Sequence, residues 1–297
     1  MRHGLVTVAV IALAAWMGPP RAFPQQRPDE QARSVSWSPQ TPAPAIAADP
    51  SDAKAASDVR RFRLEATTFD NAVSNGFGQW WGGGLHLSYQ PSARWKASSQ
   101  FYWQNRPGGS ELLFGASALV DWSGWFSTDL AMSGGGPDDP AAFFPHLRYD
   151  LTANLKIPPI PGLILTGGLT RLYFGTPTNG RVARLGSIYY WNRFVFQGTL
   201  FFNNSRPGNH KSKSVSGAVQ YGQEGHYWAG LVMGGGREAW QTLSLTPQDA
   251  EFTSYSGSLF FRKWLAPSYG AAFSYHYAVK RAAYRIHGFE MKFFWDF

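Results

Sequence analysis

The chain has 297 residues and a formal net charge of +8; 44% of its residues are hydrophobic, 16% aromatic and only 15% charged, and none is cysteine. Charged residues fall well below the ~25% usual for soluble domains, and the aromatic content argues against disorder over most of the length. The lack of cysteine excludes disulfides and a cysteine nucleophile, and beyond the N-terminus no apolar run reaches the ~18 residues of a membrane-spanning helix.

The N-terminal segment has the pattern of an export signal. Arg2 and His3 supply positive charge, Leu5 to Met17 is largely apolar, and a polar stretch follows Ala22. We therefore expect a signal peptide over residues 1–22. The alternative, an uncleaved anchor, is disfavoured because the apolar run is too short to span a bilayer. Residues 23–57 are rich in Pro, Ala, Gln, Ser and Asp, which predicts a disordered periplasmic linker.

From residue 58 onward, segments of ten to fourteen residues alternate in polarity between clusters of turn residues. In Pro145–Lys156, for example, apolar residues occupy the odd positions and polar or charged residues the even ones. Only a period of two separates these residues into two faces, so the pattern predicts strands. About fourteen are expected, with 12 or 16 as alternatives: 60–70, 79–90, 94–105, 112–122, 125–133, 145–156, 163–174, 181–191, 193–203, 212–223, 226–236, 250–265, 268–279 and 285–297.

The connections between these segments alternate between tight turns and longer loops. Tight turns are expected near residues 91–92, 123–124, 192, 224–225 and 266–267, and longer loops at 106–111, 134–144, 175–180, 204–211 and 237–249. An outer-membrane barrel has short periplasmic turns and longer outside loops. Residues 58–297 are therefore predicted to form a transmembrane antiparallel up-and-down β-barrel of all-β class, located in the outer membrane of a Gram-negative cell, with both termini periplasmic.

Aromatic residues gather beside the tight turns, as in the girdle that faces a lipid–water boundary. The set comprises Tyr89, Trp95, Trp122, Trp125, Trp191, Tyr227, Trp264, Tyr269, Trp295 and Phe297. The alternative, the core of a soluble β-sandwich, is disfavoured because a soluble sheet needs many charges on its outer face.

The last segment has aromatic or apolar residues at alternate positions and ends on phenylalanine: Phe289, Met291, Phe293, Trp295 and Phe297. It resembles the C-terminal strand that bacterial outer-membrane barrels present to the barrel-assembly machinery. More narrowly, residues 163–237 resemble the YaiO family of outer-membrane β-barrels, through Leu172-Tyr173-Phe174, Tyr189-Tyr190 and Ser214-Val215-Ser216-Gly217. We extend the resemblance over the whole barrel; it implies a fold but no catalytic or binding residue.

Enzymatic chemistry has few candidates in this sequence. No Gly-Lys pair of a phosphate-binding loop and no His-Glu-x-x-His metal motif occurs, so no cofactor or metal is expected. Ser274 and His276 share one face of a predicted strand, and Glu290 lies on the same face of the next, which would suit a hydrolase acting on envelope lipids. Two inward residues of a barrel strand are expected to be polar in any case, and we favour a barrel that is not an enzyme.

The polar faces of the strands carry charges of both signs, with positive in excess. The predicted lumen-lining residues are Lys96, His146, Arg148, Asp150, Lys156, Arg184, Arg262, Glu290 and Lys292, and Arg61, Arg63, Glu65 and His276 share these faces. Fourteen strands fall between eight, whose interior is filled, and sixteen, which leave a channel. Two interpretations therefore stay open, namely a passive pore for a small anionic solute or glycan, including traffic of surface polysaccharide, and a structural or adhesive barrel with a plugged lumen.

Basic residues also gather in and beside two of the predicted loops. Arg206, His210, Lys211 and Lys213 fall in or beside one loop, and Lys280, Arg281 and Arg285 in or beside the last. Their charge fits contact with phosphates of lipopolysaccharide, so outer-membrane lipid and lipopolysaccharide are expected partners. No nucleic acid partner is expected, because the sequence has neither a basic helix nor a stacking module.

Overall fold

The computed structural model describes residues 61–137, 142, 144–176, 178–239, 251–280 and 284–297. The predicted signal peptide and linker lie outside the described residues. Within them, no helix is long and apolar enough to cross a membrane. The structure has fourteen strands: β1 (Phe62–Val73), β2 (Gly78–Ser92), β3 (Trp95–Arg106), β4 (Gly109–Ser123), β5 (Phe126–Gly134), β6 (Leu147–Lys156), β7 (Leu163–Gly175), β8 (Thr178–Trp191), β9 (Phe194–Arg206), β10 (His210–Gln223), β11 (Tyr227–Ala239), β12 (Glu251–Ala266), β13 (Tyr269–Lys280) and β14 (Tyr284–Asp296).

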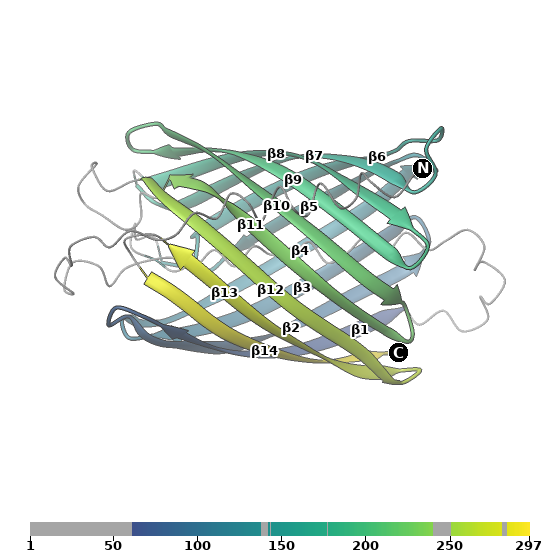
Figure 1. The fold of residues 1–297 in the computed structure, drawn as a ribbon, viewed down its shortest axis with the longest axis horizontal. Coiled ribbons are helices and arrows are strands. Elements are labelled where there is room, and N and C mark those ends of the chain that lie inside the picture. Colours follow the sequence, from purple (N-terminus) through teal and green to yellow (C-terminus); the bar gives the residue numbers. More distant parts are fainter. Residues whose placement is uncertain (1–60, 138–141, 143, 177, 240–250, 281–283) are drawn as a thin grey trace, which may run out of the picture.

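The strands form one closed antiparallel barrel. Each strand pairs with its neighbours in the sequence, and β14 pairs with β1 to close the wall (Figure 1). The predicted all-β barrel of fourteen strands is confirmed, and the alternatives of 12 and 16 are excluded. The last strand ends at Asp296, but Phe297 continues its ladder through two backbone hydrogen bonds of 2.9 Å with Phe62. Closure leaves no strand edge without a partner, as a sheet in lipid requires.

The two ends of the barrel differ in their connections. One end, here called the turn end, carries Phe62, Phe297 and the connections 93–94, 124–125, 157–162, 192–193, 224–226 and 267–268. The other, the loop end, carries the two longest connections, 135–146 and 240–250. Because the periplasmic turns of such barrels are short, we expect the turn end to be the periplasmic one.

The predicted loops at 106–111, 175–180 and 204–211 are wrong in extent, because most of their residues belong to strands. β9 runs to Arg206 and β10 starts at His210, so Lys211 and Lys213 are strand residues. The polar composition that suggested loops has another physical cause. Near the loop end the strands leave the apolar band of the membrane, and their outward residues become polar while backbone pairing continues.

The two faces of the wall differ as the alternation predicts. Leu169, Leu185 and Leu259 point outward and are 61%, 60% and 58% exposed, whereas Thr67, Ser88 and Gln220 point inward and are buried. This arrangement, apolar outside and polar inside, is that of a barrel surrounded by hydrocarbon. Trp122, Trp125, Trp191, Tyr269 and Trp295 of the predicted girdle are outward and exposed.

Trp264 was placed in that girdle wrongly. Its side chain is buried, 6% exposed, and packs edge-on against Phe294 with ring centroids 5.0 Å apart. Trp264 lies near the tight turn, as predicted, but alternate residues of a strand point to opposite faces of the wall. Arg262 and Trp264 point inward, while Lys263 and Leu265 point outward. Trp264 therefore belongs to the interior described below.

The glycine triplet Gly82-Gly83-Gly84 in β2 makes room for aromatic rings of the adjacent strand. A side chain at Gly83 would collide with the ring of Trp103, and one at Gly84 with the ring of Tyr102, both on the adjacent β3. The pairing of β2 with β3 has no bulge at these positions. The glycines thus let aromatic side chains lie flat over the sheet.

A cluster of apolar side chains fills the interior at the loop end between β14, β1 and β2. It consists of Val73, Phe77, Trp80, Tyr284 and Ile286. Trp80 is 2% exposed, donates its indole N–H to the carbonyl of Phe77 at 3.2 Å, and lies 4.1 Å from the guanidinium carbon of Arg106. This packing ties the loop end together across the seam where β1 meets β14.

Trp80→Ala is expected to lower the free energy of unfolding by about 3–5 kcal/mol, because it removes a large buried side chain and leaves a cavity. The adjacent Trp81 supplies a matched control, since its side chain points outward and is 51% exposed. Unfolding in urea, followed by the gel mobility of the folded barrel, would measure both variants. Equal losses for Trp80→Ala and Trp81→Ala would contradict a stabilising role for this cluster.

Candidate functional site

Alternation along the strands directs a set of charged side chains into the lumen. Lys96, Arg148, Asp150, Lys156, Arg184, Arg262, Glu290 and Lys292, all predicted lumen-lining residues, occupy inward positions. His146 does not, because it precedes β6, is exposed, and has its Nδ1 3.0 Å from the carbonyl oxygen of Gly136. It belongs to the long connection 135–146 rather than to a strand face.

Ion pairs between distant strands show that these side chains meet inside the barrel. Arg262 on β12 and Glu65 on β1 are joined by a contact of 2.6 Å between Nη2 and Oε1. β13 and β14 separate these strands, so their backbones lie about 14 Å apart along the wall at ~4.8 Å per strand. Two side chains can span that arc only on its concave side, across the lumen.

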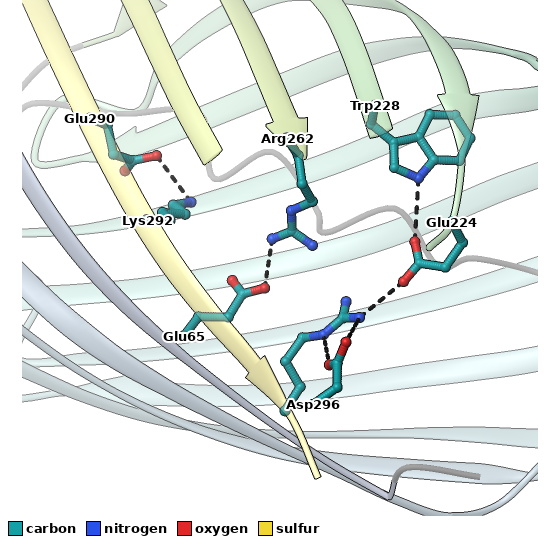
Figure 2. Close-up of polar contacts among 8 residues, drawn as sticks. Glu65, Glu224, Trp228, Arg262, Glu290, Lys292 and Asp296 are labelled. Carbon is teal, nitrogen blue, oxygen red and sulfur yellow. Dashed lines mark hydrogen bonds and ion pairs between the residues drawn. The ribbon is translucent and has the colours of Figure 1, made fainter. Parts of the chain in front are cut away.

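A second contact crosses the lumen nearer the turn end. Arg63 on β1 pairs with Asp296 on β14, with Nε–Oδ1 and Nη2–Oδ2 distances of 2.5 and 3.0 Å. The same guanidinium donates to Glu224 in the β10–β11 turn at 3.0 Å, and Glu224 also accepts a bond of 3.3 Å from the indole of Trp228 (Figure 2). A bidentate guanidinium–carboxylate pair holds Arg63 in place for the second contact.

Aromatic rings separate and support these cations. The Arg262 guanidinium carbon lies 4.7 Å from the ring centroid of Phe294, and that of Arg63 lies 5.4 Å from the same ring. Such contacts stabilise guanidinium groups that have lost part of their hydration. Lys292 and Glu290 add an ion pair of 3.0 Å on β14. We call this set the turn-end cluster: Arg63, Glu65, Glu224, Trp228, Arg262, Trp264, Glu290, Lys292, Phe294 and Asp296.

A separate group lies on the wall formed by β6, β7 and β8. Asp150 accepts two hydrogen bonds from Arg148, of 2.6 and 2.9 Å, and one of 2.5 Å from the Thr170 hydroxyl. Arg184 approaches Asp150 to 3.5 Å. Two guanidinium groups therefore share one carboxylate, and this wall cluster, Arg148, Asp150, Thr170 and Arg184, presents net positive charge to the lumen.

Some residues that line the lumen were not predicted to do so from the sequence. His86 and Asp129 lie on inward faces, and the period of two would have found both. Asp296 was not among the predicted lumen-lining residues, although its carboxylate faces inward and pairs with Arg63. Glu224 lies in a turn, where no periodic pattern applies, and only barrel closure brings it to Arg63. These added carboxylates reduce the positive excess that the sequence suggested.

The candidate hydrolase residues are only partly brought together. Ser274 donates its hydroxyl to Glu290 Oε1 at 3.4 Å, and the two residues face each other in the β13–β14 register. The His276 ring lies over Gly288 beside Asn71, and no hydrogen bond joins His276 to Ser274 in the described part of the chain. A nucleophile with its general base is therefore not assembled here. Among the described residues, no three His, Asp or Glu side chains gather as metal ligands.

The residues of the predicted assembly signal all point outward. Phe289, Met291, Phe293, Trp295 and Phe297 are 46–59% exposed, on the face that meets lipid. The Phe297 ring stacks on that of Phe62 with centroids 5.5 Å apart. The signal thus lies on the seam where the last strand meets the first.

Comparison with known proteins agrees with this architecture. The family model described as YaiO membrane beta barrel domain matches residues 62–241. No curated protein matches the chain. Among solved structures, a bacterial polysaccharide outer membrane secretin is similar with a TM-score of 0.53 and 8% identity, over 81% of this chain and 100% of that one.

Two further solved structures match similar shares of both chains, with lower TM-scores. OmpF of Salmonella typhi, solved with daunomycin, gives a TM-score of 0.44 and 7% identity over 79% of this chain and 97% of that one. Omp33 of Acinetobacter baumannii gives a TM-score of 0.49 and 9% identity over 81% of this chain and 100% of that one. The family match covers the stretch 163–237 that carried the resemblance and extends from residue 62, but it ends at residue 241, before β12, and so does not reach over the whole barrel. The protein is an outer-membrane β-barrel, as its sequence predicted.

Proposed function

This chain belongs to the YaiO family of membrane β-barrels, and we propose that it is a passive conduit for small solutes that carry negative charge, acidic glycans included. The observation that carries the proposal is the set of ionised side chains on the lumen wall between the turn end and the apolar cluster of the loop end. Charged groups in a barrel interior need water or counter-charges, and a watery lumen supplies both.

The two clusters give this conduit distinct regions. The turn-end cluster pairs most of its charges and narrows the lumen near the periplasmic end. The wall cluster keeps two guanidinium groups on one carboxylate, which favours anions passing that level. The fold shared with a polysaccharide secretin supports including an acidic oligosaccharide among the solutes tested, although at 8% identity the likeness concerns the fold alone.

Planar-bilayer recording of the full-length barrel tests the proposal. We expect resolved current steps, and a reversal potential in a KCl gradient that indicates preference for chloride over potassium. The Arg148→Gln/Arg184→Gln variant should lose that preference while still conducting, because it removes both cations of the wall cluster. Absence of current steps from folded protein would contradict a conduit.

A structural barrel with a plugged lumen is the second candidate. It is favoured by two contacts inside the lumen, Arg262 with Glu65 and Arg63 with Glu224, which join strands three steps apart and four to five steps apart around the wall. Such contacts would stiffen the barrel even if nothing passed through it. The bilayer recording separates the candidates, since a plugged barrel gives no current steps.

We further propose that the barrel is not an enzyme. The Ser274 hydroxyl is directed to Glu290, which is itself paired with Lys292, and not to His276, so the Ser–His pair of a hydrolase is not formed. Purified protein is expected to release no fatty acid from outer-membrane lipids, as measured by mass spectrometry. Release that disappears in Ser274→Ala or His276→Ala, but not in Ser258→Ala, would overturn this expectation.

A further inference from the structure

The outward face of β6 to β10 carries a basic row near the loop end. Tyr149, Arg171, Arg181, Asn204 and Lys211 are successive partners in the registers of these five strands. Lys213 lies two residues below Lys211 and is 5.8 Å from the ring of Phe202. Asp150, the only acidic residue in these strands, points inward. The row therefore concentrates positive charge on a lipid-facing surface.

The two arginines at its centre repel each other, and an anion between them would relieve that repulsion. Arg171 and Arg181 face each other directly across the β7–β8 ladder, where like charges repel. Both are exposed, and no described carboxylate pairs with either of them. Paired guanidinium groups at this spacing match the oxygens of a phosphate, which accepts several charge-assisted hydrogen bonds.

The row lies at the height of lipid headgroups. Arg171 is eight residues beyond Leu163, where β7 begins at the turn end, so it stands roughly 21 Å above that level for a strand tilted by about 40°. The apolar band of such a barrel is about 25 Å tall. The backbone of Arg171 therefore lies about 4 Å below the top of a band that begins at Leu163, and its long side chain can extend the guanidinium group to the headgroups.

An apolar groove continues from this row over the lipid-facing surface of β4 to β9. Its volume is about 940 Å³, and Arg171 and Arg181 are among its lining residues. Ala116, Ala118 and Ala183 leave space in it, between longer side chains such as Leu169 and Phe202. A polar, positively charged end joined to a broad apolar floor is complementary to a phosphorylated headgroup with several acyl chains.

We propose that this surface binds a phosphorylated, multiply acylated glycolipid of the outer leaflet, of the lipid A type. A phosphate lies between Arg171 and Arg181, Lys211 and Lys213 contact a second phosphate or the sugar, and acyl chains occupy the groove. The site lies outside the barrel wall, so it is independent of the proposed conduit. It depends on the loop end facing out of the cell.

Native mass spectrometry of the full-length barrel in detergent tests the proposal with purified bisphosphorylated lipid A. Wild type is expected to retain one lipid A, and Arg171→Gln/Arg181→Gln to reduce the bound fraction about tenfold, since it removes the charge-assisted bonds. Arg285→Gln, an exposed outward cation on β14 near the same end, is the matched control and should bind as wild type. Equal binding by the double variant and wild type would overturn the site.

Changes to the lipid and to the groove complete the test without relying on the arginine variant. Wild type should lose binding of fully dephosphorylated lipid A to the same extent. Ala183→Trp fills the groove between Leu169 and Phe202, and it should weaken lipid A binding while Ala271→Trp, outward on β13, does not. Phosphatidylglycerol binding as tight as lipid A would show a surface for any anionic lipid, and full binding by Ala183→Trp would remove the groove; either result overturns the proposal.

Discussion

Deletion of Phe297 is expected to reduce the amount of folded barrel in the outer membrane roughly tenfold or more, because it opens the seam between the last strand and the first. Phe297 and Phe62 exchange two backbone hydrogen bonds of 2.9 Å, and their rings are stacked. Without Phe297, the backbone N–H and C=O of Phe62 lose their partners at the edge of the membrane, where each unpaired group costs several kcal/mol.

Two further variants separate the seam from general loss of an aromatic side chain. Phe297→Ala keeps the backbone bonds, so it should have a smaller effect than the deletion. Phe261→Ala removes an outward ring that is 48% exposed on β12, away from the seam, and should leave assembly close to wild type. Heat-modifiable mobility of protein in the membrane fraction measures all three. Normal assembly of the deletion variant would contradict a requirement for the backbone pair between Phe297 and Phe62.

Replacing Glu65 and Arg262 together by alanine is expected to raise single-channel conductance roughly twofold, because it removes an ion pair that spans the lumen. The contact is only 2.6 Å long, and both side chains are largely withdrawn from water, 15% and 21% exposed. The double change is required, since removal of one partner alone would leave the other charge buried without its counter-ion.

The wall cluster supplies the matched control for this experiment. Arg148 and Asp150 also form a short ion pair, but both belong to β6 and their contact runs along the wall, not across the lumen. Arg148→Ala/Asp150→Ala removes one charge of each sign and no contact between distant strands, so it should leave both ion preference and conductance close to wild type. A Glu65→Ala/Arg262→Ala channel with wild-type conductance would show that the cross-lumen pair does not limit the current.

The glycolipid site illustrates why strand extent matters. A loop that ended β9 at Asn203 and began β10 at Ser212 would have left Asn204 and Lys211 outside any register. Because pairing continues beyond the apolar band, Lys211 becomes the end of an ordered row that includes Arg171 and Arg181. Polarity alone does not distinguish a loop from a strand that has left the membrane.

The amino-acid sequence by itself determined the strands and their inward and outward faces, because a period of two is a local property that each segment carries alone. Only the tertiary structure decided which charges meet. Arg63 and Asp296 are 233 positions apart, Arg262 and Glu65 are 197 apart, and Arg63 and Glu224 are 161 apart. No local pattern links such residues, since closure of the barrel and the register of fourteen strands bring them together.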